Sequence, residues 1–248
     1  MHNKDAKQIT FLDERYYFDN KTATYHPSAT TILNVYPKGH GFMQWLKDLG
    51  SNADQVVQRA QDQGTKIHEA IEDFLNGKEV KWCNEAGEAN YTLQEWMMIM
   101  RFHEFYTTYK PENIAVEAKL VSSKLDFGGT LDYVCRLPDF PGEVWYIDWK
   151  TGNAIYKTNK LQGAAYQQLW NELKRFKITR LGCMHLNAKT RGADKKGKKI
   201  QGKGWRLEEI DDPQKYFTLF KHTQELWKEE NPNPKPKNLI YPDSISKK

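Results

Sequence analysis

The chain has 248 residues, which fits one large domain or two small ones and buries a core without disulfides. Only 39% of the residues are hydrophobic, and no apolar run approaches the roughly 18 residues of a membrane span, which excludes a transmembrane protein. The net charge of +5 is compatible with a polyanionic partner but does not demonstrate one. The three cysteines form no CxxC pair, which argues against a disulfide framework or zinc ribbon. The N-terminus resembles neither a signal nor a transit peptide, so we expect a cytoplasmic protein.

The first 110 residues predict a hairpin or short strands followed by helices. Apolar and aromatic residues over 9–18 and 22–25 flank a turn at Asp19 and Asn20, a pattern that is typical of short strands. Between residues 53 and 75 apolar side chains recur at helical spacing and form one stripe, with His68 at its edge. The helices expected here are a short one capped by Ser28 or Thr30 and longer ones over 41–49, 53–75 and 92–109.

From residue 111 onward the pattern changes to strands. Segments rich in β-branched and aromatic residues predict three strands, a helix and a fourth strand, and so a central mixed sheet flanked by helices. The strands are expected at 114–121, 129–134, 144–150, 179–186 and 204–210, and the helices at 160–176 and 213–229. We expect one domain over 1–230, with an N-terminal part (1–110), a core (111–186) and a C-terminal part (187–230), before a proline-containing tail (231–248).

Two carboxylates and an ammonium group fall on neighbouring predicted strands. Asp132 lies on one strand and Asp148 on the next, and Asp148 shares a face with Lys150 because side chains alternate along a strand. Carboxylate oxygens suit Mg²⁺ or Mn²⁺, which keep open positions for water and phosphate oxygens. A nearby lysine orients a water nucleophile or offsets charge on a phosphorane. By itself the pattern is short, and it is also explained if Asp132 caps a turn or pairs with a surface lysine.

Four motifs in chain order strengthen the metal-site interpretation. The four motifs are Gly-Thr-Lys-Ile-His at 64–68, Gly-Gly-Thr-Leu-Asp at 128–132, Ile-Asp-Trp-Lys-Thr at 147–151 and Gln-Gly-Ala-Ala-Tyr at 162–166. In these motifs the chain resembles PD-(D/E)XK nucleases of the RecB-like exonuclease branch. Through the Pro-Ser-Ala-Thr stretch at 27–30 and the predicted helix at 64–75 it is similar to the mitochondrial genome maintenance exonuclease and related phage exonucleases. The resemblance covers roughly residues 25 to 180.

This resemblance implies a restriction-endonuclease-like α/β fold, with an N-terminal helical wall or arch over the site. It implies that the metal is held by three side chains and one main-chain carbonyl, those of His68, Asp132, Asp148 and Trp149. Lys150 would be the catalytic lysine. Gln162 and Tyr166, four residues apart on one helix face, would position the DNA backbone.

Other residues are candidates for supporting roles. Glu117, on its predicted strand, is an auxiliary metal ligand or a surface acid. Glu72 stands where a zincin helix needs its second histidine, so a metalloprotease is excluded. The stretch 189–203 holds seven positive residues and one negative residue, and it is either a phosphate contact or a solvated loop. The lysines expected to contact DNA are Lys157, Lys160, Lys195, Lys196, Lys198 and Lys199.

The function expected from the resemblance is that of a Mg²⁺- or Mn²⁺-dependent exonuclease acting on single-stranded DNA ends. It would serve phage or host DNA replication, recombination or repair. The cysteines are misplaced for an iron–sulfur cluster and there is no Walker A sequence, so we expect neither a cluster nor a bound nucleotide. A helicase, polymerase or annealing protein is then a possible partner. Two alternatives stay open: a flap or branched-DNA endonuclease of the same fold, and a nucleic-acid-binding module with an inactive site.

Overall fold

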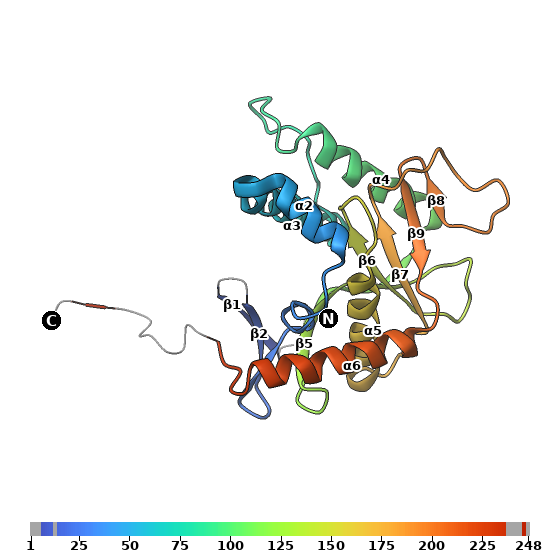
Figure 1. Cartoon of the computed structure of the whole chain (residues 1–248). Coiled ribbons are helices and arrows are strands. Elements are labelled where there is room, and N and C mark those ends of the chain that lie inside the picture. Colours follow the sequence, from blue (N-terminus) through green and yellow to red (C-terminus); the bar gives the residue numbers. More distant parts are fainter. Residues whose placement is uncertain (1–5, 12–13, 237–244, 247–248) are drawn as a thin grey trace.

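A six-stranded mixed sheet is the centre of the structure, a computed structural model that describes residues 6–11, 14–236 and 245–246 (Figure 1). Its strand order is β4-β5-β6-β7-β9-β8, and only β6 and β7 run parallel. The predicted mixed sheet is confirmed. The strands are β4 (Glu112–Ser122), β5 (Phe127–Arg136), β6 (Trp145–Lys150), β7 (Arg180–His185), β8 (Gln201–Gly202) and β9 (Trp205–Glu209).

Helices cover both faces of this sheet and enclose two apolar cores (Figure 1). The first core lies against α1 (Ala29–Leu33), α5 (Lys157–Leu173) and α6 (Pro213–Glu230). The second core lies against α3 (Ala53–Leu75) and α4 (Leu93–Tyr109). Because side chains alternate along β6, its odd-numbered aromatic and aliphatic residues enter the second core, and Tyr146 enters the first. Asp148 and Lys150 therefore face the α5 side.

The helices and strands follow local sequence signals, with some shifted bounds. Helix α3 spans the predicted residues, and α4 begins after a capping box in which Thr92 and Glu95 exchange hydrogen bonds. The prediction of 160–176 for α5 was wrong at both ends. The helix starts at Lys157 because the Tyr156 N–H donates to the Asn159 side chain at 2.7 Å. It ends at Leu173 because Lys174 is extended.

A small antiparallel sheet precedes the core and packs against β4 and β5. It consists of β1 (Ala6–Phe11), β2 (Glu14–Asp19) and β3 (Thr24–Pro27). The expected segment at 9–18 contributes to both β1 and β2, and residues 12–13 within it lie outside the described residues. Ser28 caps α1, since its hydroxyl accepts from the Thr31 N–H at 2.9 Å. The hydroxyl of Tyr17 reaches Thr130 of β5 at 2.7 Å and ties the two sheets together.

The N-terminal helices project from the sheet on one side (Figure 1). Helix α2 (His40–Leu49) has no buried residue, and a 3-10 turn, η1 (Gly50–Asn52), joins it to α3. Helix α3 buries only Ile67, Ala70 and Ile71, all in its second half. Its second half therefore anchors this projecting part. Among the described residues, no helix combines the length and apolar character needed to cross a bilayer.

Replacing Gly129 by Ala is expected to destabilise the fold by about 1–3 kcal/mol, the usual cost of overpacking a core. A Cβ at this position would lie 2.2 Å from Cε1 of Tyr166, whose ring packs on the bare strand. Urea unfolding of Gly129→Ala and of Gly192→Ala, where an added Cβ meets nothing within 4 Å, gives the comparison. Equal unfolding midpoints for the two variants would contradict the expected clash.

Candidate active site

Three carboxylates occupy one level of the central sheet, on strands β4, β5 and β6. The pairing register places Glu117 of β4 and Asp148 of β6 on either side of Asp132. The β5–β6 pairing ends at Tyr133 and Ile147, next to this level, where the Trp149 N–H donates to Asp132 Oδ2 at 3.0 Å. Asp132 and Asp148 are both buried. The strand pairing thus brings three acidic side chains close together.

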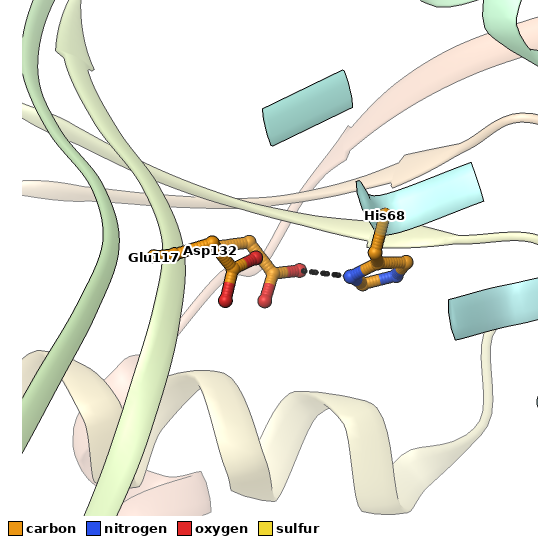
Figure 2. Close-up of side chains that lie close together, drawn as sticks. All are labelled: His68, Glu117 and Asp132. Atoms are coloured by element: carbon orange, nitrogen blue, oxygen red, sulfur yellow. Dashed lines mark ion pairs between the residues drawn. The ribbon is translucent and has the colours of Figure 1, made fainter. Parts of the chain in front are cut away.

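Glu117 has a strained backbone inside a strand. Its φ is 46°, in the left-handed region that side-chain-bearing residues rarely adopt. The other described non-glycine residues with positive φ lie in turns, bends or at helix caps, whereas Glu117 lies within β4. Strain of this kind persists where surrounding structure enforces it, and it is concentrated at functional sites. This conformation accompanies a Glu117 carboxylate directed at Asp132 (Figure 2).

His68 approaches these carboxylates from α3 and completes a possible metal-binding cluster (Figure 2). One ligand atom from each of His68, Glu117 and Asp132 lies within 4.8 Å of the others. The His68 Nδ1 atom is 3.7 Å from Asp132 Oδ2. His68 also hydrogen-bonds the main chain of Trp149, so the Trp149 main chain lies beside the cluster. One imidazole with several carboxylates is a donor set that suits Mn²⁺ or Mg²⁺.

The electrostatics of the cluster favour a divalent cation. Burial and then the Asp148 charge raise the pKa of Asp132 to about 8. Burial and then the Asp132 charge raise the pKa of Glu117 to about 9. Burial, together with the nearby Lys150 charge, lowers the pKa of His68 to about 4, so its imidazole is neutral at pH 7 and able to bind a metal. Metal-ligand chemistry therefore fits the residues present.

Asp148 lies beside this cluster and pairs with Lys150. Its Oδ2 is 2.7 Å from Lys150 Nζ, and its Oδ1 accepts from the Tyr146 hydroxyl at 3.2 Å. Burial opposes the charged form of Lys150, but the Asp148 and Asp132 charges prevail and raise its pKa. Asp148 is also within hydrogen-bonding reach of Asp132. The structure thus brings Asp132, Asp148 and Lys150 together, as the sequence predicts.

Gln162 and Tyr166 extend this chain of contacts along α5. Lys150 Nζ donates to Gln162 Oε1 at 3.3 Å, and Gln162 Nε2 donates to the Tyr166 hydroxyl at 3.3 Å. Tyr166 is only 2% exposed and packs on Gly129, so it lies behind Gln162. Direct contact with DNA therefore remains a prediction for Gln162, while Tyr166 supports it.

The lysines predicted to contact DNA have different surroundings. Lys157 is exposed at the start of α5. Lys160 is half-buried and its Nζ is 3.5 Å from Glu208 Oε1, so its charge already has a partner. Those of the basic stretch, Lys195, Lys196, Lys198 and Lys199, are exposed on a loop whose backbone N–H groups bond Asp194. DNA contact by any of these lysines stays a prediction.

Two buried neighbours of Asp148 were missed by the sequence analysis. Tyr146 donates to Asp148, and the Cys183 thiol lies 4.0 Å from Asp148 Oδ2. Alternation along β6 could have identified Tyr146, two residues before Asp148 on the same face. Cys183 comes from β7, and only the parallel β6–β7 register places it opposite Asp148.

The sequence model of the PD-(D/E)XK nuclease superfamily matches residues 33–237, and the chain belongs to this superfamily. The expected restriction-endonuclease-like fold is thereby confirmed, whereas its branch within the superfamily stays a prediction. No curated protein matches the chain. Among solved structures, one that matches is the crystal structure of a "putative exonuclease" from Eubacterium rectale. It is 12% identical, with a TM-score of 0.43, over 75% of this chain and 76% of the other.

Proposed function

We propose that this nuclease-superfamily protein is a metal-dependent DNA exonuclease that hydrolyses phosphodiester bonds at single-stranded ends. The observation that supports it most is the meeting of His68, Glu117 and Asp132 within 4.8 Å, beside the Asp148–Lys150 pair. These residues come from four separate elements, α3, β4, β5 and β6, and a surface ion pair requires no such convergence.

The metal, Mg²⁺ or Mn²⁺, would be held by the side chains of His68, Asp132, Asp148 and, as an auxiliary ligand, Glu117, with the Trp149 carbonyl. When bound it would lower the pKa of a coordinated water and offset phosphate charge. The residues account for this need, because burial and the neighbouring carboxylates raise the pKa values of Asp132 and Glu117, and a bound cation would displace the protons and stabilise the charged carboxylates. No iron–sulfur cluster and no nucleotide forms part of the proposal.

Lys150 would supply a fixed positive charge to the reaction. Its raised pKa keeps it protonated at neutral pH, and its hydrogen bonds to Asp148 and Gln162 hold the ammonium group in place. A charged donor that is already oriented costs no reorganisation when charge develops on the phosphorane. Lys150 would thus stabilise the transition state, while Gln162 contacts the DNA backbone.

The finer points of this proposal come from the family resemblance. They are the preference for single strands and a strand end that threads beneath α2 and α3. They also include a role in phage or host DNA replication, recombination or repair in the cytoplasm. The basic stretch at 189–203 and Lys157 would contact phosphates along the strand. A helicase, polymerase or annealing protein would supply any motor or partner activity.

The test is incubation of the purified protein with end-labelled single-stranded, double-stranded and circular single-stranded DNA, in Mg²⁺, Mn²⁺ or EDTA. We expect metal-dependent loss of the linear single strand alone, with the position of the label giving the direction. Cutting of the circle would replace the proposal by an endonuclease of the same fold. DNA binding without cleavage in any metal would replace it by a binding module.

A further inference from the structure

The main chain of Arg15, on β2, is held by the segment that follows β3. The Arg15 N–H donates to the Thr31 hydroxyl at 3.0 Å, and that hydroxyl donates to the Arg15 carbonyl at 3.1 Å. The Ser28 N–H donates to the same carbonyl at 2.8 Å. Thr31 and Ser28 are both buried, so these bonds are shielded from water. Ser28 and Thr31 therefore fix the backbone position of Arg15.

Strand geometry turns the Arg15 side chain toward the carboxylate cluster. Arg15 and Tyr17 share one face of β2 because side chains alternate. The Tyr17 hydroxyl bonds Thr130, two residues before Asp132 on β5, and the Tyr17 ring packs on Gly128. The face of β2 that carries Arg15 and Tyr17 therefore lies against the part of β5 that leads to Asp132.

The Arg15 charge acts on several groups at the site. Arg15 hydrogen-bonds the Tyr17 side chain. Burial is the largest influence on the pKa values of Tyr17, Glu117 and Tyr166 and raises all three, whereas the Arg15 charge lowers each of them. Tyr17, Glu117 and Tyr166 come from β2, β4 and α5, so the guanidinium group is near the point where these elements meet.

This guanidinium group has no carboxylate partner within ion-pair distance in the part of the chain that the structure describes. By contrast Arg136, Arg180 and Arg206 pair with glutamates at 3.1, 3.0 and 2.7 Å. Arg15 is half-buried, so part of its hydration is lost without a compensating ion pair. A cation in this situation beside a nuclease site is suited to an anionic ligand.

Resting on the proposed function, we propose that Arg15 binds a phosphate group of the DNA strand next to the metal cluster. The planar guanidinium group donates two parallel hydrogen bonds to phosphate oxygens, which fixes the orientation of the phosphate as well as its position. The phosphate is either the one that is cleaved or one at the end of the strand. In both cases Arg15 places the strand against Asp132, Glu117 and Lys150.

Cleavage by Arg15→Ala, Arg15→Lys and Lys7→Ala provides the first test. Lys7 is an exposed residue of the same small sheet that pairs with Phe18, and it lies on the face opposite to Tyr17. We expect Arg15→Ala to lower kcat/KM about 10²-fold. Arg15→Lys should lose less activity than Arg15→Ala, because lysine keeps the positive charge but cannot donate two parallel hydrogen bonds. Lys7→Ala should cleave like the wild type.

The salt dependence of DNA binding is a readout that a purely structural role would not change. It is measured with Mg²⁺ in the Lys150→Ala background, so that the DNA is not consumed. Loss of one phosphate contact lowers the slope of log K against log salt by about 0.7 for a single strand. We expect this change with Arg15→Ala, but not with Arg15→Lys or Lys7→Ala. Thermal unfolding checks that each variant is folded.

The outcomes separate the two proposals. An unchanged kcat/KM and an unchanged salt slope in a folded Arg15→Ala protein would overturn the role of Arg15 while leaving the nuclease intact. A wild type that cleaves no DNA would overturn the nuclease, and the salt slope would still test Arg15. Substrates with a 5′-phosphate or a 5′-hydroxyl identify the phosphate. A loss confined to the 5′-phosphate substrate assigns Arg15 to the strand end, and an equal loss on both assigns it to an internal phosphate.

Discussion

Asp148→Asn and Lys150→Ala should each lower kcat by about 10²–10³ or more, with the fold and DNA binding largely retained. Asp148 is a proposed metal ligand and holds Lys150 at 2.7 Å, so Asp148→Asn affects two functions at once. Lys150→Ala removes the ammonium group that pairs with Asp148. Both residues pair with β7 through their main chains, so neither side-chain substitution removes a strand pair. Single-turnover cleavage with saturating DNA measures the chemical step.

Two exposed residues provide matched controls for these variants. Asp211→Asn and Lys124→Ala remove the same charges at exposed positions outside the four motifs, and both should cleave like the wild type. Circular dichroism and DNA binding of all four variants show whether an activity loss is local. Near-normal cleavage by either Asp148→Asn or Lys150→Ala would refute the assignment of this site.

Metal binding is expected to depend on His68, Asp132 and Glu117 and to release protons. At pH 7 the raised pKa values of Asp132 and Glu117, about 8 and about 9, keep protons on these carboxyls until a cation displaces them. Affinity for Mn²⁺ should therefore rise with pH, by up to about tenfold per unit for each proton displaced. Calorimetry in buffers of different ionisation enthalpy counts the protons released.

Substitution of these ligands should weaken Mn²⁺ binding by at least about 10–100-fold, since even residues that only orient ligands have effects of that size. The variants are His68→Ala, Asp132→Asn and Glu117→Gln. Glu208→Gln is the control, because Glu208 lies opposite Cys183 at the same level of the sheet but pairs with Arg206 and Lys160. Wild-type affinity in Glu117→Gln would remove Glu117 from the ligand set and leave the other two.

The same pKa values predict how stability changes with pH when no metal is present. In the unfolded chain both carboxyls lose their protons near pH 4, whereas in the native state they keep them to about pH 8 and about pH 9. The native state then binds more protons over this interval, so the free energy of unfolding falls as pH rises through it. Urea unfolding between pH 5 and 9 should show this decline, and Asp132→Asn should reduce it.

Much of the fold and of the metal-site candidates could be predicted from local patterns. The apolar stripe of Ile67, Ala70 and Ile71 predicted α3, because a helix that buries one face must repeat apolar residues at its own period. The alternation of Asp148 and Lys150 predicted their shared face for the same kind of reason. Periodicity was less informative where a capping hydrogen bond decides the first residue of a helix, as between Tyr156 and Asn159 at the start of α5.

Local patterns could not predict the contacts that depend on strand register. Glu117 was an ambiguous acid until the β4–β5 pairing placed it beside Asp132 with a left-handed backbone. Cys183 reaches Asp148 only through the parallel β6–β7 pairing. Arg15 lies more than a hundred residues before Asp132, and no motif includes it. Register is set by packing across the whole sheet, so short windows of sequence do not contain it.

The sequence by itself determined which chemical groups are available and the order of the elements that carry them. Residue types, apolar periods and motif spacing are local properties, and they were sufficient to predict the sheet, its flanking helices and the Asp132, Asp148 and Lys150 set. The tertiary structure alone decided how these groups interact: burial raised the pKa of Asp132 to about 8, and the fold placed Arg15 where its charge acts on Glu117. Both effects depend on desolvation and distance between residues far apart in the chain, which exist only once the chain is folded.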